Sequence, residues 1–137
     1  MLPEERPPSG PRGRTGAEAE AAAAAHLVAH GWIILARNVH IGRDELDLVA
    51  RDPDRALVVV EVRARSGSAF GTGVESVDAR KVARLYRAAG ALRRDGHPAL
   101  GPGALTHPLR VDLVTLRRHA SGAWRVEAHI RGLEPPA

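Results

Sequence analysis

The chain has 137 residues, which suits one domain with short tails, and its 44% hydrophobic and 26% charged residues argue against wholesale disorder. The absence of cysteine excludes disulfides, thiolate zinc sites and a cysteine nucleophile. No apolar run approaches the ~20 residues of a membrane-spanning helix, and the N-terminus lacks the apolar core of a secretory signal. We therefore expect a cytoplasmic protein with no membrane partner.

The charge of the chain favours a polyanionic partner. Twenty Lys and Arg residues exceed sixteen Asp and Glu residues, which gives a net charge of +4. A basic domain of this size suits nucleic acid, although the arginine codons of a GC-rich genome would produce the same balance. Only 3% of the residues are aromatic, so contacts are expected from arginines to the phosphate backbone rather than by base stacking.

The first half of the chain predicts an arm, a helix and three strands. Residues 1–15 are rich in Pro, Gly and Arg and are expected to be a disordered basic arm. The alanine-dense run over 16–30 predicts a helix, which Gly31 ends. Strand-like patterns then occupy 32–40, 45–51 and 56–65, with Leu46 and Leu48 expected on one face of the second strand.

The second half predicts a helix and two further strands. Asp78 is placed to cap a helix over 79–94, and strands fit 109–116 and 124–131. The order α-β-β-β-α-β-β predicts an α/β fold with a mixed central sheet. We expect a single domain over 16–131, followed by a tail over 132–137.

Two carboxylates lie within apolar strands. Glu61 interrupts the run VVVEV, and an unpaired buried carboxylate costs several kcal/mol or shifts its pKa. Asp47 lies in LDLV on the preceding strand, and the short turn between the two strands predicts an antiparallel hairpin. A pairing register that sums to 108 places Asp47 opposite Glu61 on one face, whereas a sum of 107 places them on opposite faces.

Two helix residues are expected to face the same region. Glu20 projects roughly 20° from Leu27 on the apolar stripe of the first helix, whereas Glu18 projects to the solvent side. Lys81, the only lysine of the chain, lies within the apolar stripe of the second helix. Converging carboxylates with a nearby cation suit Mg²⁺ or Mn²⁺, and the alternative is a buried salt bridge of Glu61 with Arg63 or Lys81.

The motifs resemble those of a known family. Asp47 with Glu61-Val62-Arg63 resembles the D…(D/E)-x-K signature of restriction-endonuclease-like nucleases. More closely, residues 13–115 resemble the YraN family of predicted endonucleases, which are similar to archaeal Holliday-junction resolvases. The matching segments are Ala19-Glu20, Arg37-Asn38, Asp44–Ala50, Val59–Arg65, Phe70-Gly71, Glu75–Val77, Lys81 and Arg110–Leu113.

The resemblance implies a restriction-endonuclease-like α-β-β-β-α-β core and a metal-dependent phosphodiesterase. Asp47 and Glu61 would hold Mg²⁺, or Mn²⁺, with the carbonyl of Val62. Glu20 would be a further ligand or would position a coordinated water molecule. A metal-dependent endonuclease acting on branched or structured DNA is then the expected function.

The chain departs from the family pattern at two positions. Asp44 replaces a glycine, and Arg63 stands where the nuclease lysine belongs. Arginine stays protonated in proteins and can stabilise a pentacoordinate phosphate but cannot act as a base. We therefore expect Lys81 to supply the missing amine, which makes Asp47, Glu61, Arg63 and Lys81 the candidate catalytic residues.

Four arginines are candidates for contacts with DNA, namely Arg65, Arg80, Arg84 and Arg87. A homodimer would suit cleavage of both strands of a junction. The main alternative is a non-catalytic nucleic-acid-binding module that keeps the nuclease fold. A third is a structural protein in which the acids only form ion pairs, as Asp112 is expected to do with Arg110.

Overall fold

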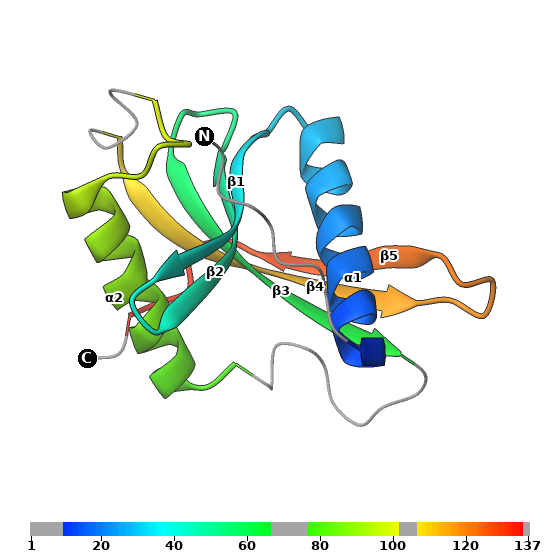
Figure 1. The fold of residues 1–137 in the computed structure, drawn as a ribbon. Helices are drawn as coiled ribbons and strands as arrows, with labels where there is room; N and C mark the ends of the chain where they lie inside the picture. The colour runs from blue at the N-terminus through cyan, green and yellow to red at the C-terminus, as the bar shows by residue number, and fades with distance from the viewer. Residues whose placement is uncertain (1–9, 67–76, 102–106, 136–137) are drawn as a thin grey trace.

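A computed structural model describes residues 10–66, 77–101 and 107–135, with side chains from residue 16 onward. Two helices and five strands follow in the predicted order α-β-β-β-α-β-β (Figure 1). Within these ranges, no helix is long and apolar enough to cross a membrane. The elements are α1 (Gly10–Ala29), β1 (Ile33–Ile41), β2 (Asp44–Arg51), β3 (Leu57–Ser66), α2 (Ala79–Asp95), β4 (Leu109–Arg118) and β5 (Trp124–Ile130).

The first helix begins earlier than the sequence predicts. It starts at Gly10, so residues 10–15, which were expected to belong to the basic arm, are helical, and residues 1–9 lie outside the described part of the chain. Once the alanine-rich run has formed a helical nucleus, each further residue adds a hydrogen bond at little cost, which explains the extension. At the other end Gly31 adopts a φ of +88° and its N–H donates to the Val28 carbonyl.

The five strands form one mixed sheet in the order β1-β2-β3-β4-β5. All neighbouring strands pair antiparallel except β3 and β4, which are parallel and are connected through α2. This is the mixed α/β arrangement predicted from the sequence, and it is the arrangement that a restriction-endonuclease-like core implies.

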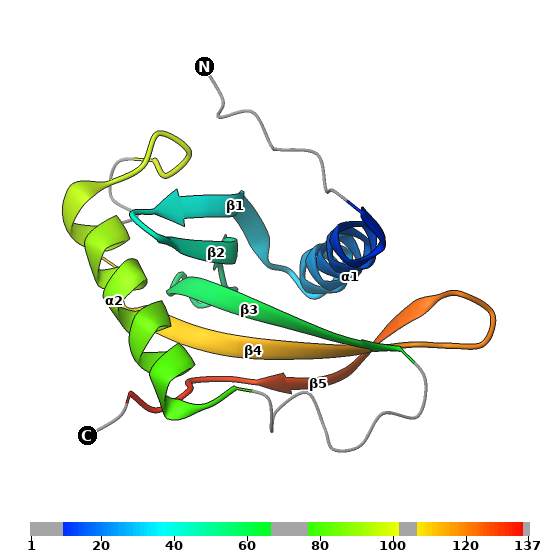
Figure 2. The ribbon, with the colours of Figure 1, turned by 60° about the horizontal axis from the view of Figure 1, so that its bottom comes forward.

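The sheet is covered on both faces, by one helix each (Figure 2). On one face, Ala23, Ala24 and Leu27 of α1 pack on alternate residues of β2, β3 and β4, such as Val58 and Val60. On the other face, the apolar side of α2 packs on the intervening residues, such as Val59. Side chains of even number in β3 therefore point to α1, and those of odd number, including position 61, point to α2.

The regular alternation of side chains between the two faces of the sheet breaks in the middle of β2. Leu48 packs with the α1 cluster, but Leu46 packs with the α2 cluster, so the prediction that both lie on one face is wrong. The facing strand shows the cause, because Asn38 has a φ of +51° between the ladder pairs Arg37↔Leu48 and Val39↔Leu46. A residue in the left-handed conformation rotates the remainder of its strand, and the rotation occurs at the position of Asp47.

A buried polar network lies at the end of the sheet that contains the β2–β3 turn. Asp112 on β4 is fully buried and accepts hydrogen bonds from Arg110 Nε at 2.7 Å, His129 Nε2 at 2.8 Å and the Gly132 N–H at 3.0 Å. Arg110 also donates to Asp52 in the β2–β3 turn at 2.8 Å. Asp112 is therefore a structural residue paired with Arg110, as its place in the sequence predicts.

Candidate active site

The register of the β2–β3 hairpin decides whether the two strand carboxylates meet. The ladder pairs Leu48↔Val60, Val49↔Val59, Ala50↔Val58 and Arg51↔Leu57, so each pair sums to 108, which is the first of the two registers considered from the sequence. The ladder ends at Leu48↔Val60, and Asp47 occupies the next position. Its Oδ2 accepts a hydrogen bond from the Val62 N–H at 2.9 Å. The carboxylate of Asp47 thus takes the place of a backbone acceptor, immediately beside Glu61.

Glu61 is buried among apolar strands and is only partly neutralised. The residue is 4% exposed, and its Oε1 lies 3.2 Å from Arg63 Nη2 and 3.6 Å from Lys81 Nζ. Its Oε2 is buried and has no hydrogen-bond partner among the described residues. Both cations named in the salt-bridge alternative therefore pair with Glu61, but they converge on the same oxygen and leave Oε2 without a cationic partner among the described residues.

Asp47 is surrounded by negative charge. Removal from water, the charge of Glu61 and the charge of Glu20 raise the pKa of Asp47 to about 8, and the hydrogen bond from the Val62 N–H only partly opposes this rise. Within the described part of the chain, no Lys, Arg or His forms an ion pair with Asp47. The site in this form is therefore an acidic cluster that retains a proton near neutral pH.

Glu20 reaches the cluster from α1, as its place on the apolar stripe predicts. It is half-buried, and its charge acts on Asp47. Glu18 is exposed, as expected, and its Oε2 accepts a hydrogen bond from Trp124 Nε1 at 3.3 Å. The first helix thus directs one glutamate to the strand carboxylates and the other to β5.

Asn38 is a site residue to which sequence reasoning gave no role. With its amide nitrogen facing the acids, Asn38 donates to Glu20 Oε2 at 3.0 Å and to Glu45 Oε1 at 3.2 Å. In the β1–β2 ladder it lies at the position facing Asp47. The signal in the sequence is an asparagine within an apolar strand, because asparagine tolerates the left-handed conformation found here.

Lys81 points to the site from the first turn of α2. Asp78 caps this helix as predicted, since its side chain accepts a hydrogen bond from the Lys81 N–H at 2.9 Å. The Lys81 side chain is 28% exposed, and its ammonium group reaches Glu61 Oε1. The lysine is therefore oriented inward, as expected from its place on the apolar stripe, and it shares a partner with Arg63.

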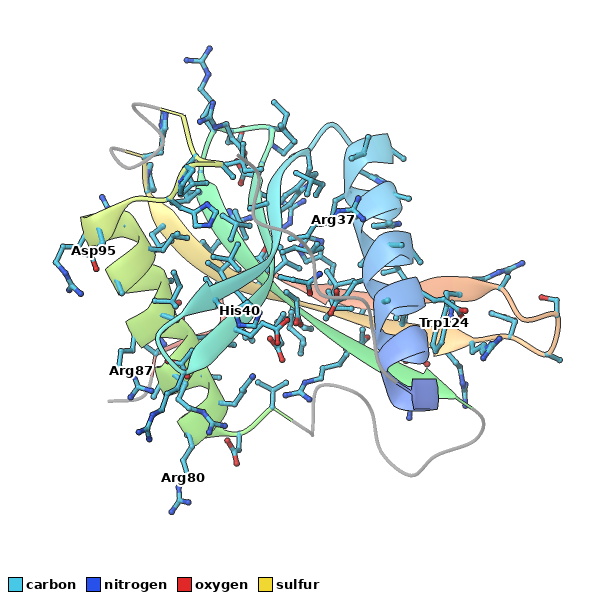
Figure 3. All side chains as sticks on the ribbon, in the orientation of Figure 1. Arg37, His40, Arg80, Arg87, Asp95 and Trp124 are labelled. Atoms are coloured by element: carbon cyan, nitrogen blue, oxygen red, sulfur yellow. The ribbon has the colours of Figure 1, made fainter. Side chains whose placement is uncertain are left out.

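The four arginines predicted to contact nucleic acid differ in their surroundings. Arg80 and Arg84 are exposed on α2, and Figure 3 shows Arg80 and Arg87 extending from that helix at the edge of the molecule. Arg87 Nη2 lies 3.3 Å from Asp44 Oδ2, so the acid that replaces a family glycine joins the β1–β2 turn to α2. Arg65 is 15% exposed and donates to both oxygens of Glu127 at 2.9 and 3.2 Å.

The donor groups of the cluster can be compared with the needs of a hard divalent cation. In the residues that the structure describes, no three His, Asp or Glu side chains converge closely enough to form a complete protein cage for a metal. Mg²⁺ does not need one, because it commonly binds through one or two carboxylates and retains several water molecules. Asp47 and Glu61 meet this requirement, and the buried Glu61 Oε2 is available as a ligand. The donor set therefore fits Mg²⁺ or Mn²⁺.

Comparison with known proteins assigns the family. The model of the uncharacterised protein family UPF0102 matches residues 19–116. A UPF0102 protein of Nocardioides sp. is 42% identical over 118 residues, covering 86% of this chain and 89% of the relative. A UPF0102 protein of Deinococcus radiodurans is 49% identical over 84 residues, covering 61% and 68%.

Among solved structures, a repair endonuclease from Pyrococcus abyssi matches with a TM-score of 0.41 and 19% identity, over 72% of this chain and 37% of that chain. A likeness of this size carries no inference about activity. The sequence match, by contrast, extends over the segment that carries Glu20, Asp47, Glu61 and Lys81, and it confirms the resemblance seen in the motifs. The chain belongs to the uncharacterised protein family UPF0102.

Proposed function

We propose that this protein is a metal-dependent endonuclease that hydrolyses phosphodiester bonds of DNA, with branched or structured DNA as its substrate. The observation that carries the proposal is the position of the Asp47 carboxyl beside Glu61, just beyond the last pair of the β2–β3 ladder. One buried oxygen of Glu61 and the whole carboxyl of Asp47 lack a cationic partner among the described residues. A salt bridge alone accounts for one oxygen of Glu61 and leaves the rest of the cluster unexplained.

The carboxylates would hold the ion from two strands. Asp47 is positioned by the Val62 N–H, and because the N–H and C=O of one strand residue point the same way, the Val62 carbonyl is available on that side. Glu20, held by Asn38, faces the cluster from α1. When bound, Mg²⁺ or Mn²⁺ supplies a Lewis acid that lowers the pKa of water and offsets charge on a phosphodiester.

The two cations at Glu61 have different abilities. Arg63 stays protonated, so it can stabilise the negative charge that develops on the phosphate but cannot remove a proton. Lys81 carries a primary amine, the type of group that serves as a base in other enzymes and that a guanidinium cannot replace. Both groups contact Glu61 Oε1, at 3.2 and 3.6 Å, and this shared contact supports giving Lys81 the role that the strand lysine has in the family pattern.

The proposal is tested by a cleavage assay with four-way junction, flap and linear DNA in the presence of Mn²⁺. The wild type is expected to cut or nick at least one substrate, and Glu61→Gln is expected to be at least 100-fold slower. Arg94→Ala, which removes an exposed charge at the far end of α2, is the control and should match the wild type. Equal cutting by wild type and Glu61→Gln would show that the activity does not belong to this site.

A second candidate function is a nucleic-acid-binding module that has lost catalysis. The presence of Arg63 in place of the strand lysine favours it, because the usual amine is missing from β3. Such a module would bind DNA, with an affinity that falls steeply with salt, and would leave every substrate intact. Arg63→Lys separates the two functions, since a gain of cutting only in that variant would identify the natural protein as the module.

A further inference from the structure

The outer part of the sheet carries a row of arginines that the proposed site does not use. The ladders pair Arg65 on β3 with Arg117 on β4, and Arg117 with Arg125 on β5. Paired residues project to the same face of a sheet, so these three residues form a continuous arginine row across three strands. Arg65 is four residues beyond Glu61 on the same strand, so the row lies on the face to which Glu61 points, about 13 Å from Glu61.

The arginine row shares one acidic neighbour and presents guanidinium groups to solvent. Glu127 accepts two hydrogen bonds from Arg65 Nη2 and lies 3.9 Å from Arg117 Nη1. The Arg117 side chain is 43% exposed, and Arg125 is exposed. Arg117 and Arg125 face each other directly across β4 and β5, and like charges in such a pair destabilise a sheet. An anionic ligand that contacts both guanidinium groups would offset this repulsion.

The hairpin that bears Arg117 and Arg125 projects from the body of the molecule and is anchored at its base. Figures 1 and 2 show the β4–β5 hairpin extending beyond α1. Trp124, which Figure 3 shows beside α1, donates a hydrogen bond through Nε1 to Glu18. The guanidinium group of Arg118 lies over the Trp124 ring, 5.7 Å from the ring centroid. The described hairpin residues 117–125 contain three arginines and no acid. The projection is thus a fixed basic surface.

We propose that the arginine row is a second phosphate-binding surface for the nucleic acid that enters the carboxylate site. Arg80 and Arg84 are exposed on α2, the helix whose Lys81 reaches Glu61, and the arginine row lies about 13 Å further along β3 from Glu61. The substrate is then a duplex segment that continues past the cut bond in both directions, rather than a short end. This inference rests on the proposed function, since it assigns the substrate surface of the same site.

The test is the salt dependence of binding to a labelled duplex of about 20 base pairs, two helical turns, without divalent ions. Each phosphate contact contributes about 0.9 to the slope of log K against log salt. The double variant Arg117→Ala/Arg125→Ala is expected to lose about 2 from the slope and roughly 30-fold in affinity at 0.15 M salt. Arg94→Ala removes one exposed arginine away from the site and should lose less than twofold.

A charge reversal distinguishes lost binding from lost folding. Arg125→Glu places opposite charges across the strands, so the melting temperature is expected to equal or exceed that of the wild type while DNA affinity falls further than in Arg125→Ala. If the row variants bind as tightly as Arg94→Ala while the wild type still binds and cuts DNA, the arginine row is not a binding surface and the nuclease proposal stands. If the wild type binds no DNA, both proposals are overturned.

Discussion

At the scale of single residues, the repulsion among the carboxylates of Asp47, Glu61 and Glu20 determines the protonation of the site. Among the described residues, Asp47 accepts one backbone hydrogen bond, and the charges of Glu61 and Glu20 disfavour its ionised form. Its pKa of about 8 means that folding without a cation takes up a proton at neutral pH. In the unfolded chain Asp47 has released this proton at neutral pH, because the ordinary pKa of the group is 3.8. The cluster therefore lowers stability as pH rises, which is typical of sites shaped for a ligand.

This proton uptake predicts a pH dependence that one substitution removes. Between pH 4 and pH 8 the folded Asp47 binds a proton that the unfolded chain has released, so the free energy of unfolding falls as pH rises, by at most about 1.4 kcal/mol per unit. Asp47→Asn keeps the hydrogen bond from Val62 but cannot ionise. Urea unfolding of the metal-free proteins at several pH values should show the difference between them grow from pH 5 to pH 8. A constant difference would contradict the assigned cluster.

The roles of the two cations at Glu61 give a second prediction. Lys81→Ala is expected to lower kcat for Mn²⁺-dependent cleavage by about 100-fold or more with little change in KM, because general-base contributions are of this size. Arg63→Lys is expected to raise kcat, since it adds a second amine beside the carboxylate. Single-turnover cleavage measures both variants. Undiminished cleavage by Lys81→Ala would rule out the lysine as the source of the amine.

At the scale of the elements, the hairpin β2–β3 and the network around Asp112 hold the site in place. The tight turn that contains Asp52 sets the register that pairs Leu48 with Val60, and Arg110 joins this turn to β4. Asp52 accepts the N–H groups of Asp54 and Ala56, which closes the turn. Because a slip of one residue would turn every side chain of β2 to the other face, this network is what keeps Asp47 beside Glu61.

Breaking the network should cost stability without touching the carboxylates. Asp112→Ala leaves Arg110 and His129 without their buried acceptor, and loss of one member of a buried ion pair costs about 3 kcal/mol. Arg110, His129 and the Gly132 N–H hold the pKa of Asp112 below its ordinary value, so this stability is present at neutral pH and is lost as pH falls below about 4. Denaturant unfolding at pH 7 and pH 3 measures it. Equal stability of variant and wild type at pH 7 would contradict this role.

The elements also show how far the sequence predicts the structure. The order of elements, the mixed sheet, the β2–β3 hairpin and the Asp78 cap follow from local patterns that tertiary packing does not override, whereas the sequence left two registers of that hairpin open. The switch of Leu46 to the α2 face depends on the left-handed backbone of Asn38 on the neighbouring strand, which no pattern in β2 reveals. For the same reason the sequence identified Glu20, Glu61 and Lys81 as facing inward but gave Asn38 no role in joining α1 to β1.

At the scale of the whole molecule, positive charge lies near a negative centre. Arg80 and Arg84 are exposed on α2, the arginine row crosses β3, β4 and β5, and Glu61 lies on β3 four residues before Arg65 of that row. This distribution would draw a polyanion to the site while a hard cation offsets the repulsion between phosphate and carboxylates. Cutting of both strands of a junction needs two such sites, and a homodimer of this chain would supply them. Sedimentation of the protein with and without a four-way junction tests that assembly.

Titration calorimetry with Mn²⁺ at pH 7.5 measures whether Asp47 and Glu61 together bind one divalent cation. The wild type is expected to bind one ion, with release of protons because Asp47 must ionise, which different buffer ionisation heats will reveal. Asp47→Asn and Glu61→Gln should each lose at least tenfold in affinity, whereas Asp112→Ala, if still folded, should not. Equal binding by the wild type and both site variants, or no binding by the wild type, would contradict the account.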